Sequence, residues 1–141
     1  MIYKRVFLDS NVLIDLLLSR KPFQLEARSV FELGIAGEVE LFTSSLSFMN
    51  THYIVSKTFG QKRALAVMSE ARKLLSLLSV NENIVDAAIQ NSGTDFEDAV
   101  QYYSAKAGQC DVIVSRDKSG FKDFDIPCKS PKEFIEIWKV K

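Results

Sequence analysis

Three aspartates stand where a short apolar segment has just ended or where a helix begins. Asp9 follows the apolar residues 6–8, and Asp117 closely follows the β-branched run Val112, Ile113 and Val114. Asp98 lies near the start of a predicted helix. In an open parallel sheet, ligands bind outside the carboxyl ends of the strands. We therefore expect the three carboxylates to converge at that edge.

Carboxylates brought together in this way repel one another, and a bound hard cation usually neutralises this repulsion. The expected cofactor is Mg²⁺ or Mn²⁺, with Asp9, Asp98 and Asp117 as its ligands. Such an ion polarises a phosphoryl oxygen, activates a water molecule and offsets charge on the leaving oxygen. The predicted reaction is hydrolysis of a phosphodiester bond, and the sequence leaves open whether one ion or two would bind.

Each aspartate also has a simpler structural role open to it. Aspartate is a favoured helix cap, and acidic side chains stabilise the first turn of a helix. Asp98, like its neighbours Asp95 and Glu97, could serve that purpose alone. A cap or turn also stays open for Asp9 and Asp117, although their position after apolar strands favours the metal site.

The elements that would position these residues alternate between strands and helices. Strands are expected at 6–8, 39–42, 112–114 and 125–128, with a brief one in 80–84. Helices are expected at 12–18, 24–36, 45–57, 61–78, 85–90, 95–107 and from 131 onward. This alternation predicts a single α/β domain over residues 1–141, with a central parallel sheet of about four to five short strands and helices on both faces.

The composition restricts the setting in which the chain works. Its 18 basic and 18 acidic residues cancel, so any contact with nucleic acid must be local. The two cysteines fit neither a disulfide framework nor a zinc site, and we expect reduced thiols in a reducing compartment. No apolar run has the length of a signal peptide or a membrane span. We therefore expect a cytoplasmic protein with no membrane partner.

The segments VFLDSNVLIDLL, DFEDAVQYYSAKAGQCDVIVSRD and GFKDFDIPCKSPKEF together resemble the PIN-domain family over nearly the full length of the chain. The resemblance implies a PIN-like fold with a Mg²⁺ or Mn²⁺ site that cuts RNA, in which Asp9, Asp98 and Asp117 match three of four acidic positions. At the other position, within SSLSFMNTHYIVSK, Asn50 replaces the usual glutamate, as in a PIN subgroup. Asn50 could bind the ion through its carbonyl oxygen, position a water, or mark weakened catalysis.

The resemblance adds three candidates for supporting the site: Asn11, Asp95 and Asp123. Asn11 would hold Asp9 by a hydrogen bond, or would simply cap the helix. The other two would support the site or lie on the surface. We expect Asp15 to point into solvent and Arg116 to contact substrate phosphate or water. His52 is left out of the site, because no second histidine or cysteine lies at ligand spacing.

Small PIN domains of this size resemble VapC-like toxins of bacterial toxin–antitoxin pairs. The resemblance therefore implies a metal-dependent endoribonuclease that acts on RNA, binds a cognate antitoxin protein and forms a homodimer. A second hypothesis, motivated by Asn50, is a catalytically weakened PIN-like module that binds RNA or protein. A receiver-like signalling domain ranks last, because Asp9 has no adjacent acidic partner and no lysine follows a late strand as such a domain requires.

Overall fold

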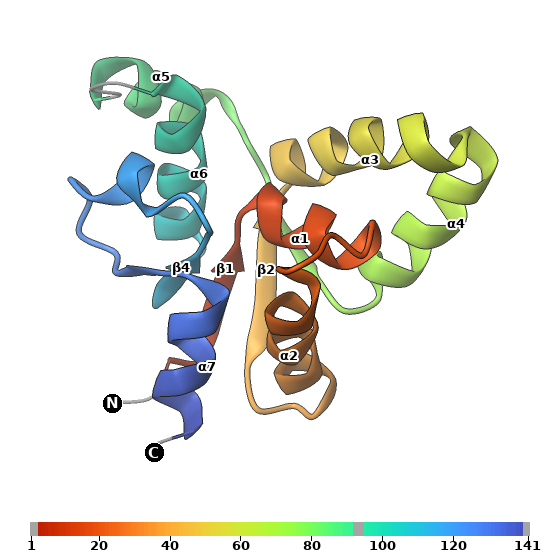
Figure 1. The fold of residues 1–141 in the computed structure, drawn as a ribbon. Helices are drawn as coiled ribbons and strands as arrows, with labels where there is room; N and C mark the ends of the chain where they lie inside the picture. The colour runs from red at the N-terminus through yellow and green to blue at the C-terminus, as the bar shows by residue number, and fades with distance from the viewer. Residues whose placement is uncertain (1–2, 92–94, 140–141) are drawn as a thin grey trace.

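A computed structural model describes residues 3–91 and 95–139 of the chain (Figure 1). Within those residues, five parallel strands form one sheet in the order β3-β2-β1-β4-β5. The strands are β1 Arg5–Leu8, β2 Glu40–Ser44, β3 Ser76–Leu78, β4 Val112–Val114 and β5 Cys128–Lys129. The central strand β1 pairs with β2 on one side and with β4 on the other. The predicted α/β architecture with a short-stranded parallel sheet is confirmed.

The helices cover both faces of the sheet, as predicted. They are α1 Ser10–Leu17, α2 Gln24–Ile35, α3 Ser45–Phe59, α4 Gln61–Arg72, α5 Glu82–Asn91, α6 Phe96–Ala107 and α7 Pro131–Lys139, with a short 3-10 helix η1 at Lys118–Phe121. In Figure 1, α3 and α4 form a hairpin that projects to one side, opposite α5 and α6. In the described chain, no helix has both the length and the apolar character needed to span a membrane.

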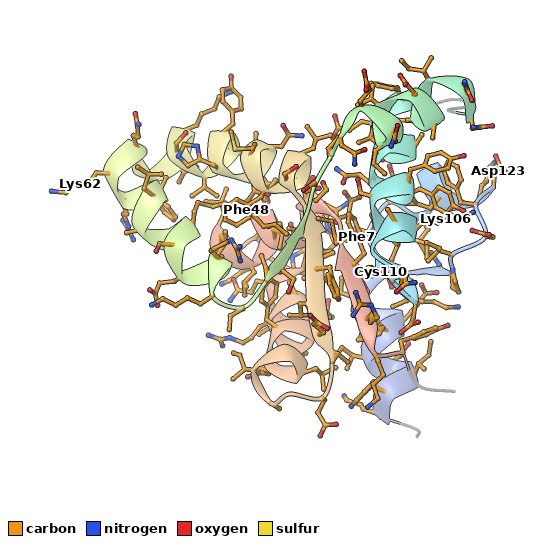
Figure 2. The ribbon with its side chains drawn as sticks, turned by 180° about the vertical axis from the view of Figure 1, so that it is seen from behind. Phe7, Phe48, Lys62, Lys106, Cys110 and Asp123 are labelled. Carbon is orange, nitrogen blue, oxygen red and sulfur yellow. The ribbon has the colours of Figure 1, made fainter. Side chains whose placement is uncertain are left out.

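Alternating side chains of the inner strands enter two separate cores. Val6 and Leu8 of β1 pack with residues of α1, α2 and α7, whereas Phe7 faces the other way and packs against α6. Figure 2 shows Phe7 on this second face of the sheet. Because both faces are covered, β1 reads as an uninterrupted apolar run, which is typical of buried parallel strands. This packing fixes the position of Asp9, the residue that follows β1.

The predicted helix over 61–78 is wrong in its last third. Helix α4 ends at Arg72, and Ser76–Leu78 forms the edge strand β3, in which Ser76 pairs with Phe42 and Leu78 with Ser44. Leucines continue the helical spacing past Arg72, but backbone pairing with β2 decides the conformation. The strand predicted within 80–84 is also wrong, because α5 begins at Glu82.

Cys110 and Cys128 are free thiols, as expected from the cysteine count. Burial raises the pKa of each to about 12. Both thiols therefore stay protonated at neutral pH, and a protonated thiol is a poor nucleophile and metal ligand.

Candidate active site

The residues that follow β1 and β4 share one hydrogen-bond network. The backbone N–H of Asp9 donates to the carbonyl of Val114 at 3.0 Å, which places Asp9 beside the end of β4. Ser115 Oγ donates to Asp9 Oδ2 at 2.8 Å. The same hydroxyl accepts from Asn11 Nδ2 and from the backbone N–H of Asp117, both at 3.1 Å. One buried serine thus joins two of the predicted metal ligands, and the sequence analysis did not identify it.

Asp9 is both the cap of α1 and the most buried of the predicted ligands. Its Oδ1 accepts from the backbone N–H of Ser10 at 2.8 Å, so Asp9 takes the capping role that was left open for it, and Asn11 is not the cap. Burial raises the pKa of its carboxyl, the bonds from Ser115 and Ser10 lower it, and nearby negative charges raise it further. The cap leaves Oδ2 facing Ser115, so capping does not exclude a metal-binding role.

Asp98 reaches the site from the first turn of α6. The sequence places Thr94 three residues before Glu97, a capping-box pattern that favours Thr94 as the cap, but Thr94 lies outside the described residues. The helix is capped by Asp95, whose Oδ1 accepts from the backbone N–H of Asp98 at 3.0 Å. The Asp98 carboxyl lies against Gly120 of η1, where a Cβ atom would overlap it. Helix α6 thereby brings Asp98 to the segment that directly follows Asp117.

The pKa of Asp98 is raised from 3.8 to about 7. Burial is the largest cause, followed by the negative charges of Asp95, Asp9, Asp117 and Glu97. No group of opposite charge counters these effects among the causes of the shift. A cation bound in this region would stabilise the ionised form of Asp98.

This shift predicts how the metal-free protein responds to pH. The unfolded chain loses the Asp98 proton near 3.8, whereas the folded chain keeps it up to about 7. The folded state therefore binds more protons in that window, and the free energy of unfolding should fall as pH rises through it. Urea unfolding in EDTA at several pH values should show a weaker fall for Asp98→Asn. An identical pH dependence in both proteins would contradict the assignment.

The supporting residues predicted from the sequence lie in different places. Asn11 holds Ser115 and accepts from the backbone N–H of Arg116 at 3.2 Å, so it acts on Asp9 through Ser115 and not by the direct bond that was expected. Asp123 is exposed in the loop after η1, at the outer edge of the molecule in Figure 2. Among the described residues, no hydrogen bond or ion pair joins Asp123 to the site.

Asp15 does not point into solvent as predicted. Its side chain is fully buried and binds Arg116 twice, with Nε to Oδ2 at 2.5 Å and Nη2 to Oδ1 at 3.2 Å. The Arg116 guanidinium also covers the ring of Phe23, 3.9 Å from its centroid. Arg116 thus ties the segment after β4 to α1. Its charge is already engaged, which argues against the expected contact with substrate phosphate.

Asn50 and Glu97 meet across the site, a contact that the sequence did not reveal. Asn50 lies on α3, and its Nδ2 donates to Glu97 Oε1 on α6 at 3.5 Å. The negative charge of Glu97 also helps to raise the pKa of Asp9. From the sequence, Glu97 is expected only to stabilise the first turn of its helix. The available signal was its position directly before a predicted metal ligand.

The donors at this edge suit a hard, hydrated cation. They are all carboxylates: Asp9, Asp98, Asp117 and Glu97. The nearby cations are engaged elsewhere, since Arg116 binds Asp15 and Lys118 binds Glu133. In the described part of the chain, no group of three or more acidic, histidine or cysteine side chains is arranged so that it could hold a metal ion as it stands. Mg²⁺ is commonly bound through one or two carboxylates while it keeps several waters, so these residues fit such an ion in an open site.

Comparison with known proteins gives matches over most of the chain. Residues 5–119 match the family model of a PIN domain. The chain is 31% identical over 142 residues to Ribonuclease VapC1 of Aquifex aeolicus (strain VF5), with 97% of each protein covered.

Two solved structures share the fold at lower identity. One is DNA-bound VapBC from Salmonella typhimurium, with a TM-score of 0.69, 20% identity, and coverage of 91% of this chain and 98% of that one. The other is VapC20 of Mycobacterium tuberculosis, described as a Sarcin-Ricin loop cleaving toxin, with a TM-score of 0.64, 13% identity, and coverage of 82% and 92%.

Proposed function

The chain belongs to the PIN-domain family, and from that premise we propose that it is a metal-dependent endoribonuclease that hydrolyses RNA phosphodiester bonds. The observation that carries this proposal is that Ser115 hydrogen-bonds to both Asp9 and Asp117 after β1 and β4, while Asp98 lies against Gly120 and has its pKa raised by the charges of those two aspartates. The ribonuclease name of the relative in Aquifex aeolicus supports the same activity.

In this proposal Asp9, Asp98 and Asp117 hold Mg²⁺ or Mn²⁺. The bound ion would polarise a phosphoryl oxygen of RNA and lower the pKa of an attacking water. The protein supplies orientation: Ser10 N–H and Ser115 Oγ each donate to one oxygen of Asp9, and both oxygens keep further acceptor capacity. Asn11 Nδ2 and the backbone N–H of Asp117 both donate to Ser115 Oγ, and of the two acceptors near the hydroxyl proton, Asp9 Oδ2 at 2.8 Å is closer than the Asp117 carbonyl at 3.4 Å.

We also propose that the chain is the toxin of a toxin–antitoxin pair and works in the cytoplasm, where RNA is available. The solved structures that share its fold include VapBC complexes. A protein partner could contact the apolar side chains that are exposed on α2, α3 and α4. They are Leu25, Ile35, Met49, Tyr53 and Leu65. The homodimer stays a prediction.

The distant alternative, a receiver-like signalling domain, does not fit the topology. Receiver-like sheets have the strand order 2-1-3-4-5, whereas the order here is 3-2-1-4-5. The match to the PIN-domain family argues in the same direction.

The deciding experiment is cleavage of a mixed set of structured and unstructured RNAs in Mg²⁺, Mn²⁺ or EDTA. We expect cutting with metal and none with EDTA. Asp98→Asn should lower the rate by more than about 100-fold, because loss of even an indirect partner of a metal site costs about 10- to 100-fold. Asp123→Asn is the matched control and should cut like wild type, because Asp123 lies away from the site. If wild type cuts nothing, or cuts equally in EDTA, the nuclease proposal fails and the RNA- or protein-binding module replaces it.

A further inference from the structure

Glu97 occupies a side of the acidic site that Asp98 does not reach. The two residues are neighbours in the first turn of α6, where successive side chains point in different directions. Asp98 lies against Gly120 of η1, whereas Glu97 meets Asn50 of α3. In Figure 1, α3 and α6 stand on opposite sides of the end of β1. The first turn of α6 therefore places one carboxylate beside η1 and another beside α3, on two sides of Asp9.

The carboxylate of Glu97 forms no ion pair with a lysine or arginine among the described residues. It is nevertheless close enough to act electrostatically on both Asp9 and Asp98. Of the negative charges that act on Asp9, that of Glu97 is larger in effect than that of Asp117. Glu97 therefore adds negative charge around Asp9 and Asp98, and a cation bound there would reduce that repulsion.

A purely helix-stabilising role does not account for the contact across the site. Acidic residues do favour a helix N-terminus, but Asp95 already caps α6. The bond from Asn50 to Glu97 joins two helices that are far apart in sequence. It engages only Oε1. In the described part of the chain, Oε2 has no hydrogen-bond partner and stays available.

We propose that Glu97 supplies a fourth carboxylate of the cation site, with Asn50 holding Oε1 and leaving Oε2 for the ion. This inference rests on the proposed metal-dependent function. In this proposal the neutral side chain of Asn50 orients the carboxylate of Glu97, which lies on α6. Asn50 is then a positioning residue, and the negative charge on this side of Asp9 comes from α6.

The test is binding of Mn²⁺ alone to the purified full chain, followed by the electron paramagnetic resonance signal of the free ion. This readout requires no RNA cleavage. We expect Glu97→Gln to weaken Mn²⁺ binding by about tenfold or more. Glu82→Gln is the matched control, because Glu82 is also an exposed glutamate in the first turn of a helix, α5. It should bind Mn²⁺ like wild type.

A double variant tests whether the position of the charge matters. Asn50→Glu combined with Glu97→Gln returns one carboxylate to the same contact from the opposite helix, and it should recover Mn²⁺ binding. The proposal is overturned if Glu97→Gln binds Mn²⁺ like wild type, if Glu82→Gln weakens binding equally, or if the folded double variant recovers nothing.

The Glu97 proposal and the proposed nuclease function can fail separately. Wild-type protein that binds Mn²⁺ and cuts RNA, together with an unaffected Glu97→Gln variant, would overturn the role of Glu97 alone. Wild-type protein that binds no Mn²⁺ would overturn both.

Discussion

Asp9→Asn should abolish metal-dependent RNA cleavage while leaving the metal-free protein at least as stable as wild type. Asparagine caps helices as well as aspartate does, so the bond from the backbone N–H of Ser10 is retained. The substitution removes a buried negative charge that its neighbours disfavour. Because disturbing even indirect metal contacts costs 10- to 100-fold, loss of this central ligand should cost more than about 100-fold.

The measurements are RNA cleavage with saturating Mg²⁺ or Mn²⁺ and urea unfolding in EDTA. If cleavage is lost while the free energy of unfolding is unchanged or raised, Asp9 is required for the cleavage reaction and not for folding. A variant that cuts like wild type would remove Asp9 from the metal site. A variant that unfolds more easily would instead show that the buried carboxylate matters chiefly for folding.

Arg116→Met should lower the free energy of unfolding by about 3 kcal/mol, because removing one partner of a buried ion pair leaves the other charge uncompensated. Asp15 is fully buried, and in the described residues its side chain binds only Arg116. The expected loss is at the lower end of the usual range, since the Arg116 side chain is 30% exposed. Chemical denaturation at neutral pH measures the change.

The double variant Asp15→Leu with Arg116→Met is the control for this prediction. Replacing both partners of a buried pair with apolar residues is often neutral or stabilising, so it should recover most of the lost stability. A single Arg116→Met variant that loses no more than about 0.5 kcal/mol, as a surface substitution does, would contradict the role assigned to the pair.

Both predictions involve the segment after β4, and they separate two functions within it. Ser115 and Asp117 serve the acidic site, whereas Arg116 between them points the other way and fastens the segment to α1. Loss of activity and loss of stability should therefore come from neighbouring residues with little overlap.

The residues of the inner strands were sufficient to predict the layered parallel sheet and the edge at which Asp9 and Asp117 lie. The reason is that this information is local. An uninterrupted apolar run is typical of a strand covered on both faces, and the residue after it lies at the carboxyl edge wherever the strand pairs. The acidic composition of the site follows from these positions alone.

Only the tertiary structure decided which side chains those aspartates meet. Ser115 contacts Asp9 across 106 residues, Arg116 contacts Asp15 across 101, and Glu97 contacts Asn50 across 47, separations at which no local spacing predicts a partner. The edge strand β3 was missed for a related reason, because its leucines satisfy a helical period equally well until β2 pairs with them. The orientation of a side chain and the residues it contacts depend on how distant elements pack. That packing brings the three aspartates to one acidic site.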